Sequence, residues 1–162
     1  MHFALNGTIG SIKVLLLNPI FLSTACSLCI AQLLKALIFV LSGQRGKAKE
    51  LIEITMWRTG GMPSSHSAVV TAMTASIAFS EGIESNLFIL SFWFMLVVIR
   101  DALGVRRSSG LQARALNNLG KSIAEKTGIN FNPVKEIHGH TPLEVIVGAF
   151  LGIFIAAGFA LL

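Results

Sequence analysis

The chain has 162 residues, of which 53% are hydrophobic and 13% are charged. Soluble globular proteins carry charged residues at about 25%, so this composition excludes an ordinary soluble domain and predicts one all-α, polytopic membrane domain over residues 1–162. The net charge is +5, and because the basic residues flank apolar segments, it indicates anionic lipid headgroups or membrane topology rather than nucleic acid.

Four apolar segments predict a bundle of about four transmembrane helices, with short interfacial helices in the polar connections. The first segment runs from Pro19 to Leu41, with Asn18 as its N-cap and proline at the first helical position. It is long enough for the roughly 20 residues that a bilayer core requires. The second segment, about Ser65 to Ser80, is short and repeats a small residue at every fourth position, a stripe that permits close helix contact.

The third apolar segment runs from Leu87 to Leu103, and the fourth runs from Pro142 to Leu162. Within the fourth segment, Gly148 and Gly152 form a glycine pair with the spacing of helix–helix contacts. This pair predicts that the last helix approaches a neighbouring backbone closely.

The connections between these segments are unequal in length. Residues 81–86 form a tight hairpin, whereas residues 42–64 and 104–141 are long and polar. Within the second long connection, helical spacing predicts a helix over Leu111 to Lys126 that ends at Gly128. With four spans, both long connections lie on one side of the membrane, so the polar residues converge on one face.

The first long connection ends in the run Arg58-Thr-Gly-Gly-Met-Pro-Ser-Ser-His66. Backbone N–H groups of such a loop, placed just ahead of a helix N-terminus, can face an anion, and phosphate is the natural occupant. The serines could equally be ordinary helix caps, and His66 an interfacial histidine.

The second long connection ends in the run His138-Gly-His-Thr-Pro-Leu-Glu144. On a helix beginning near Thr141, Glu144 lies about one turn from His140, so its carboxylate can bind one imidazole nitrogen and orient the other toward a substrate. Thr141 and Glu144 also fit a capping box, and Glu144 could serve both purposes. No further ligand cluster accompanies this histidine, so no metal and no other cofactor is expected.

Both motifs resemble those of the type 2 phosphatidic acid phosphatase superfamily, which includes the vanadium haloperoxidases, and above all its divergent branch of small membrane proteins. The superfamily's second motif, Pro-Ser-Gly-His, corresponds to Pro63-Ser64-Ser65-His66, with serine in place of glycine. The end of its third motif, with His, Pro, Asp and Gly at fixed offsets, corresponds to His140, Pro142, Glu144 and Gly148. The resemblance covers about residues 18–155.

The resemblance implies a metal-independent phosphatase in which His140 attacks phosphorus, Glu144 orients His140, and His66 protonates the leaving group and then activates water. It also implies groups that bind the phosphoryl oxygens. The candidates for this role are Lys35, Arg58, Ser64, Ser65 and one of Arg106 and Arg107.

Several of these residues have simpler explanations in the sequence alone. Lys35 lies about two turns from the end of its span, where snorkelling could account for it. The neighbouring arginines 106 and 107 could be topogenic charges, and Asp101 could merely pair with Arg100 or Arg106. His138 could be a lid residue or the nucleophile itself, although His140 alone fits the offsets of the third motif.

The resemblance predicts a substrate among phosphorylated membrane lipids, with phosphatidylglycerophosphate, phosphatidate and polyprenyl phosphates all open. A non-catalytic protein that binds or translocates anionic lipids on the same scaffold is the alternative. The excess of Lys and Arg in the two long connections predicts that the site faces the cytoplasm from a bacterial plasma membrane. The sequence leaves a homo-oligomer open.

Overall fold

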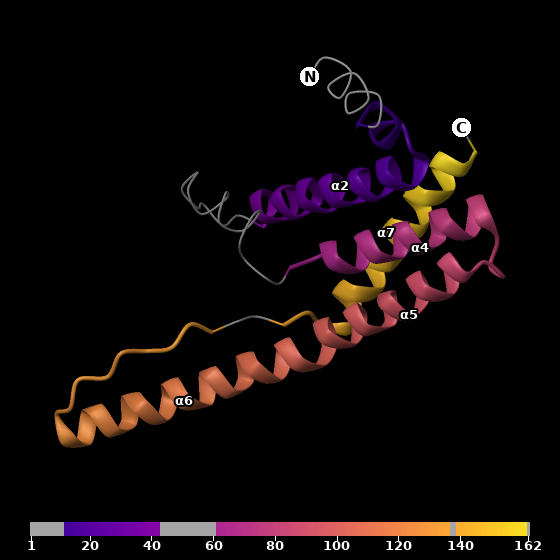
Figure 1. The fold of residues 1–162 in the computed structure, drawn as a ribbon. Helices are drawn as coiled ribbons and strands as arrows, with labels where there is room; N and C mark the ends of the chain where they lie inside the picture. Colours follow the sequence, from indigo (N-terminus) through magenta and orange to yellow (C-terminus); the bar gives the residue numbers. More distant parts are fainter. Residues whose placement is uncertain (1–11, 43–60, 137–138, 162) are drawn as a thin grey trace, which may run out of the picture.

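The computed structural model describes residues 12–42, 61–136 and 139–161, and every regular element in these ranges is helical (Figure 1). The all-α fold expected from the sequence is therefore confirmed for this part of the chain. The elements are α2 (Pro19–Leu41), α4 (Ser65–Glu81), α5 (Asn86–Arg100), a π-helical turn (Asp101–Val105), α6 (Arg106–Thr127) and α7 (Pro142–Ala160).

The helix boundaries follow from local chemistry. Asn18 caps α2, because its side-chain oxygen accepts hydrogen bonds from the N–H groups of Ile20 at 2.9 Å and Phe21 at 3.2 Å. Helix α6 ends where Gly128 adopts a φ of +70°, a left-handed conformation that glycine tolerates without strain. Both boundaries were predicted from the sequence.

Among the described residues, three helices are long and apolar enough to cross a membrane, namely α2, α7 and the continuous helix Asn86–Thr127 that joins α5 to α6. Helix α4 has 17 residues and packs against α2, α5 and α7, so it is the central helix of the bundle. The predicted count of about four spans thus resolves into three helices of spanning length and one short, mostly buried helix. Its small and hydroxyl-bearing residues suit contact with three helices better than contact with lipid.

The directions of the helices place several polar segments at the same end of the bundle, which we call the polar end (Figure 1). The last turn of α2, the starts of α4 and α7, and the junction of α5 with α6 all lie at this end. The hairpin between α4 and α5 lies at the other end, with the start of α2 and the end of α7. Convergence of the polar segments on one face, as the sequence predicted, is confirmed for the described residues.

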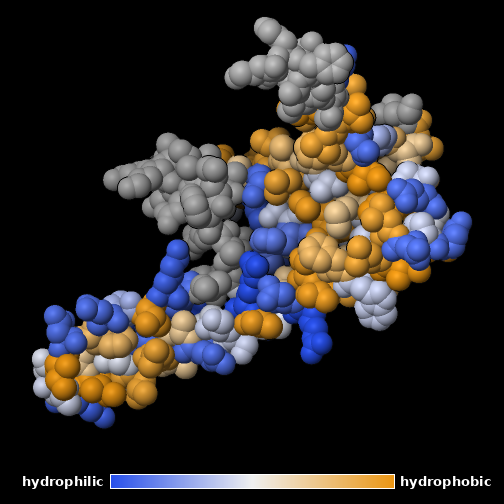
Figure 2. All heavy atoms as spheres, in the orientation of Figure 1, coloured by the Kyte–Doolittle hydropathy of each residue, from blue (hydrophilic) through white to orange (hydrophobic). Residues whose placement is uncertain are grey.

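Helix α6 is longer than expected and continues α5 without a break, beginning at Arg106 rather than Leu111. It extends away from the bundle, and residues 128–136 run back along it toward α7 (Figure 1). Figure 2 shows apolar atoms covering much of the bundle, whereas hydrophilic atoms are frequent along α6 and where α6 meets the bundle. The polar end therefore carries a long amphipathic arm.

The contact between α4 and α7 depends on the predicted glycine pair. A β-carbon at Gly148 would overlap the backbone carbonyl of Ser64, and one at Gly152 would overlap the carbonyl of Ala68 and the side chain of Thr71. Only glycine lets the two backbones approach this closely.

Helix α2 presents a stripe of one buried residue per turn to the bundle, made by Ser23, Ser27, Ala31 and Lys35. Near one end of this stripe, the hydroxyls of Ser23 and Ser76 are 2.6 Å apart, which joins α2 to α4 inside the bundle. Because Lys35 continues the same stripe, its side chain points into the bundle rather than toward lipid.

We predict that Gly148→Ala and Gly152→Ala each lower the thermal unfolding temperature in mild detergent. Overpacking a close helix contact costs about 1–3 kcal/mol, which exceeds the roughly 1 kcal/mol that a helix gains when Ala replaces Gly. Gly158→Ala in the same helix is the control, because its β-carbon would meet no atom within 4 Å. Equal unfolding temperatures for all three variants would contradict the close approach of α4 and α7.

Candidate functional site

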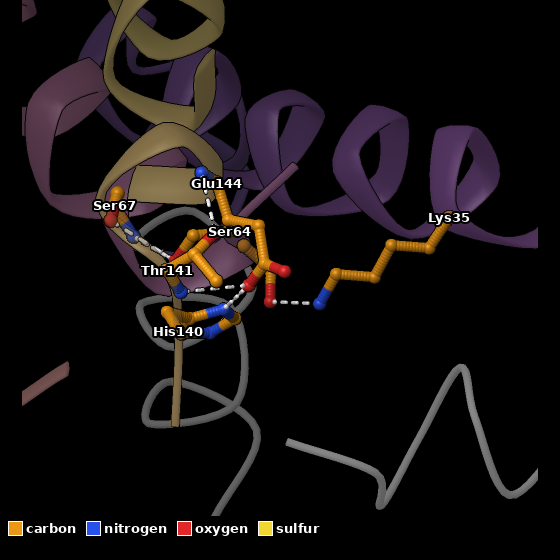
Figure 3. Close-up of polar contacts among 7 residues, drawn as sticks. Lys35, Ser64, Ser67, His140, Thr141 and Glu144 are labelled. Carbon is orange, nitrogen blue, oxygen red and sulfur yellow. Dashed lines mark hydrogen bonds and ion pairs between the residues drawn. The ribbon is translucent and has the colours of Figure 1, made fainter. Parts of the chain in front are cut away.

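The candidate site lies at the polar end of the bundle, where segments distant in the sequence meet. Figure 3 shows Lys35 reaching from α2 toward the start of α4, while His140 and Glu144 come from the start of α7. The π turn between α5 and α6 adds Asp101 and Arg106 nearby. The structure therefore brings together most of the residues that the motifs singled out.

His140 is held by the carboxylate that the sequence assigned to it. The imidazole Nδ1 lies 2.9 Å from Oε2 of Glu144, and the histidine is 1% exposed. A carboxylate beside Nδ1 favours the tautomer in which Nδ1 carries the proton, which leaves a lone pair on Nε2. The same Oε2 accepts the N–H of Thr141 at 3.3 Å, and the hydroxyl of Thr141 accepts the N–H of Glu144 at 3.4 Å. Glu144 thus caps α7 and orients His140 at once.

The start of α4 is fixed directly to the start of α7. The N–H of Ser64 donates to the backbone carbonyl of Glu144 at 2.9 Å. The Ser64 hydroxyl, which is fully buried, caps α4 by accepting from the N–H of Ser67 at 3.3 Å and from its hydroxyl at 3.0 Å. Ser64 therefore braces the two helices, and its backbone N–H is occupied by the carbonyl of Glu144. Its role as a phosphate ligand, through hydroxyl or backbone, stays a prediction.

Ser65 and Lys35 join α4 to α2 at the site. The Lys35 ammonium donates to the hydroxyl of Ser65 at 3.1 Å, and the lysine is 6% exposed. Its charge also interacts with that of Glu144. Snorkelling does not describe this side chain, because the ammonium turns inward to a specific partner instead of outward to water. Among the described residues, the N–H groups of Ser65 and His66 find no acceptor, so the start of α4 presents two donors.

His66 faces His140 across the site. The two ring centroids are 6.3 Å apart with an interplanar angle of 62°, close enough for one phosphoryl group to touch both rings. His66 is exposed while His140 is buried, so His66 stands on the side from which a substrate and water can arrive. The charges of Lys35, Arg106 and Asp101 all act on the His66 imidazole.

The two candidate arginines of the third motif are placed differently. Arg106 is bound through Nε to Oδ2 of Asp101 at 2.7 Å, which settles the choice of partner for Asp101. Arg107 is exposed, and its backbone packs against Gly139, where a β-carbon would overlap it. The charge of Arg106 acts on His66, whereas the backbone of Arg107 lies beside the residue that precedes His140.

Two predicted positions, Arg58 and His138, lie outside the described residues. The segment that leads to His140 is held on α6 by other polar groups. The Asn117 side chain exchanges two hydrogen bonds of 2.9 Å with the backbone of Val134, and both Asn117 and Arg114 bind the carboxylate of Glu136. These contacts hold residues 134–136 against α6.

The sequence did not predict a role for Asp101 in the site, because a carboxylate beside several arginines has several possible partners. A signal was available in the spacing. Asp101 and Arg106 are five positions apart, which fits a π turn and does not fit an α-helix. No group of three or more His, Cys, Asp or Glu side chains suited to a metal ion occurs among residues 12–42, 61–136 and 139–161.

Comparison with known proteins agrees with the motifs. A family model described as the divergent PAP2 family matches residues 16–155. The uncharacterized membrane protein YuiD of Bacillus subtilis (strain 168) is 36% identical, over an alignment covering 87% of this chain and 93% of that protein. No solved structure matches the chain. The matched residues include both histidine motifs and Lys35.

We predict that Ser64→Ala lowers the free energy of unfolding by about 1 kcal/mol, the usual effect of removing an N-cap side chain. Thermal unfolding in mild detergent measures this loss. Ser80→Ala, near the other end of α4, is the matched control, because Ser80 is exposed and makes one weak contact, 3.4 Å to the carbonyl of Ile77. Indistinguishable unfolding of the two variants would remove the structural role of Ser64.

Proposed function

The chain belongs to the divergent PAP2 family, and we propose that it is a membrane lipid phosphatase that hydrolyses a phosphorylated lipid through a phosphohistidine at His140. One observation carries the proposal. A buried histidine, oriented by Glu144 at 2.9 Å, faces a second, exposed histidine with ring centroids 6.3 Å apart. A nucleophile oriented by a carboxylate and a separate acid–base group are the two parts that this reaction requires.

In the first step, the lone pair on Nε2 of His140 attacks phosphorus, and the bond from phosphorus to the lipid oxygen breaks. Protonated His66 gives its proton to the departing alkoxide, so the lipid leaves as a neutral alcohol. Glu144 stabilises the positive charge that develops on the His140 ring. Lys35, Arg106 and the open N–H groups at the start of α4 stabilise the charge on the phosphoryl oxygens.

In the second step, His66 is neutral and accepts a proton from water as the water oxygen attacks phosphorus. The bond between Nε2 and phosphorus breaks, inorganic phosphate leaves, and His140 recovers its lone pair. His66 is again protonated, so the cycle closes. The exposed position of His66 suits this step, because water must reach it.

A lipid substrate is supported by where the site lies. The helices of spanning length place the two histidines at one end of the bundle, the level at which lipid phosphate groups sit. Leucine, valine and phenylalanine side chains are exposed around the bundle below this level, where acyl chains would lie. Phosphatidate, phosphatidylglycerophosphate and polyprenyl phosphates all meet these requirements.

We predict that purified protein releases phosphate from at least one lipid in a panel of these three classes, and that His140→Ala abolishes release. His66→Ala should slow turnover by about 10²–10⁴-fold, the usual contribution of a general acid–base group. Because His66→Ala slows hydrolysis of the intermediate as well as its formation, radiolabelled lipid phosphate should remain bound to this variant and be absent from His140→Ala.

His138→Ala separates the neighbouring histidines and should retain activity. Near-native release by His140→Ala would remove the nucleophile assignment. Loss of activity in a chelator, restored by a divalent cation, would contradict the metal-independent mechanism. Saturable binding of the lipids without any phosphate release would favour the alternative of an anionic-lipid binder or translocator.

We also propose that the site faces the cytoplasm. At the polar end, α6 and the segment after it carry many basic residues, and cytoplasmic connections are enriched in Lys and Arg. These residues are Arg106, Arg107, Arg114, Lys121, Lys126 and Lys135. The hairpin at the other end, residues 81–86, carries Glu81 and Glu84 and no Lys or Arg.

Single cysteines test this orientation in a background with Cys26→Ala and Cys29→Ala. We predict that a membrane-impermeant maleimide labels Glu84→Cys in intact cells and labels Ser122→Cys only after the cells are opened. Both positions are exposed, so accessibility alone does not separate them. Labelling of position 122 but not 84 in intact cells would reverse the orientation.

A further inference from the structure

The π turn between α5 and α6 gives Asp101 and Arg106 a geometry that an α-helix would deny them. In an α-helix with 3.6 residues per turn, side chains five positions apart point to different faces. In the π turn, the N–H of Arg106 bonds to the carbonyl of Asp101, five positions back. The two side chains then lie one above the other and meet at 2.7 Å.

We propose that Asp101 is a positioning residue, which through the π turn holds Arg106 so that the free edge of its guanidinium faces the phosphoryl group attacked by His140. This inference rests on the phosphatase function proposed above. It also selects Arg106 over Arg107 as the arginine of the site. Asp101 itself touches no reacting atom in this scheme.

The hydrogen-bonding capacity of arginine supports the assignment. A guanidinium has five N–H donors in a fixed plane, and Asp101 takes the one on Nε. Among the described residues, the terminal nitrogens of Arg106 have no acceptor. These nitrogens form the fork that binds two phosphoryl oxygens together. Arginine fixed at Nε thus presents its phosphate-binding edge in one orientation.

The Asp101–Arg106 ion pair lies close enough to the proposed acid–base group for its charges to act there. The charges of both Asp101 and Arg106 act on His66, the proposed acid–base group. The side chains of Asp101 and Arg106 are 41% and 36% exposed, and ion pairs so open to water stabilise a fold little. A short, oriented contact that contributes little to stability is better explained by the placement of Arg106 than by folding.

A double-mutant cycle tests the proposal with Asp101→Asn, Arg106→Met and the combined variant. The measurements are kcat/KM for phosphate release from phosphatidate or another active lipid, and the Kd of orthovanadate, a phosphoryl mimic. Arg106→Met should reduce kcat/KM by about 10²-fold or more, given what an arginine contributes to phosphoryl transfer. Asp101→Asn should reduce kcat/KM by about 10-fold, because Arg106 keeps its own positive charge but loses the carboxylate that orients it. The combined variant should equal Arg106→Met, because Asp101 acts only through Arg106.

Three further variants complete the series. Arg100→Met, an exposed arginine just before the π turn, is the matched control and should keep wild-type values. Asp101→Glu should recover most of the activity that Asp101→Asn loses. Arg107→Met should weaken orthovanadate binding less than Arg106→Met does. Unchanged thermal unfolding of Asp101→Asn separates positioning from a folding defect.

Two results would overturn the inference. One is a combined variant whose kcat/KM lies below that of Arg106→Met by the same factor by which Asp101→Asn alone lowers kcat/KM. Such additivity would mean that Asp101 acts independently of Arg106. The other is a greater loss of orthovanadate affinity in Arg107→Met than in Arg106→Met. If the wild-type protein releases no phosphate from any lipid, the proposed function is wrong, and the orthovanadate series alone then decides whether Asp101 positions Arg106.

Discussion

The distance between the first turns of α4 and α7 governs the rest of the site. The N–H of Ser64 bonds to the carbonyl of Glu144 at 2.9 Å, and this bond can form only because Gly148 leaves no β-carbon between the two backbones. His66 lies two residues after Ser64, and His140 lies four residues before Glu144. One backbone hydrogen bond between helices therefore sets the spacing of the two histidines. A glycine inside a membrane helix here sets the spacing of the two histidines as well as the packing of α4 against α7.

Glu144 shows why one methylene group can matter at this position. The superfamily motif usually has Asp, whereas the capping box favours Glu or Gln at the third helical position. The longer side chain reaches back so that a single oxygen accepts from the N–H of Thr141 at 3.3 Å and lies 2.9 Å from Nδ1 of His140. The cap fixes the carboxylate, and the fixed carboxylate fixes the imidazole. The substitution is thus compatible with the orienting role that Asp has in the motif.

Local features of the sequence could be predicted, and features that depend on helix packing could not. The cap at Asn18, the stop at Gly128 and the His140–Glu144 pair follow from residues a few positions apart, where spacing fixes geometry. The partner of Lys35 is Ser65, 30 positions away, and it depends on which face α2 turns to α4. Periodicity also could not show that the short apolar segment starting at Ser65 forms a central, mostly buried helix, because burial by protein and by lipid select similar residues.

Burial of charge at the end of a membrane bundle constrains how such a site can be built. An unpaired ion in a low-dielectric environment is strongly disfavoured, yet binding a phosphoryl group requires cations. In this structure two cations at the polar end have a nearby carboxylate, Glu144 for Lys35 and Asp101 for Arg106. Each carboxylate also has a second effect, on His140 and on His66 respectively. Glu144 therefore compensates the charge of Lys35 and also orients His140, while Asp101 compensates Arg106 and its charge also acts on His66. The same two carboxylates thus link charge compensation to the two histidines.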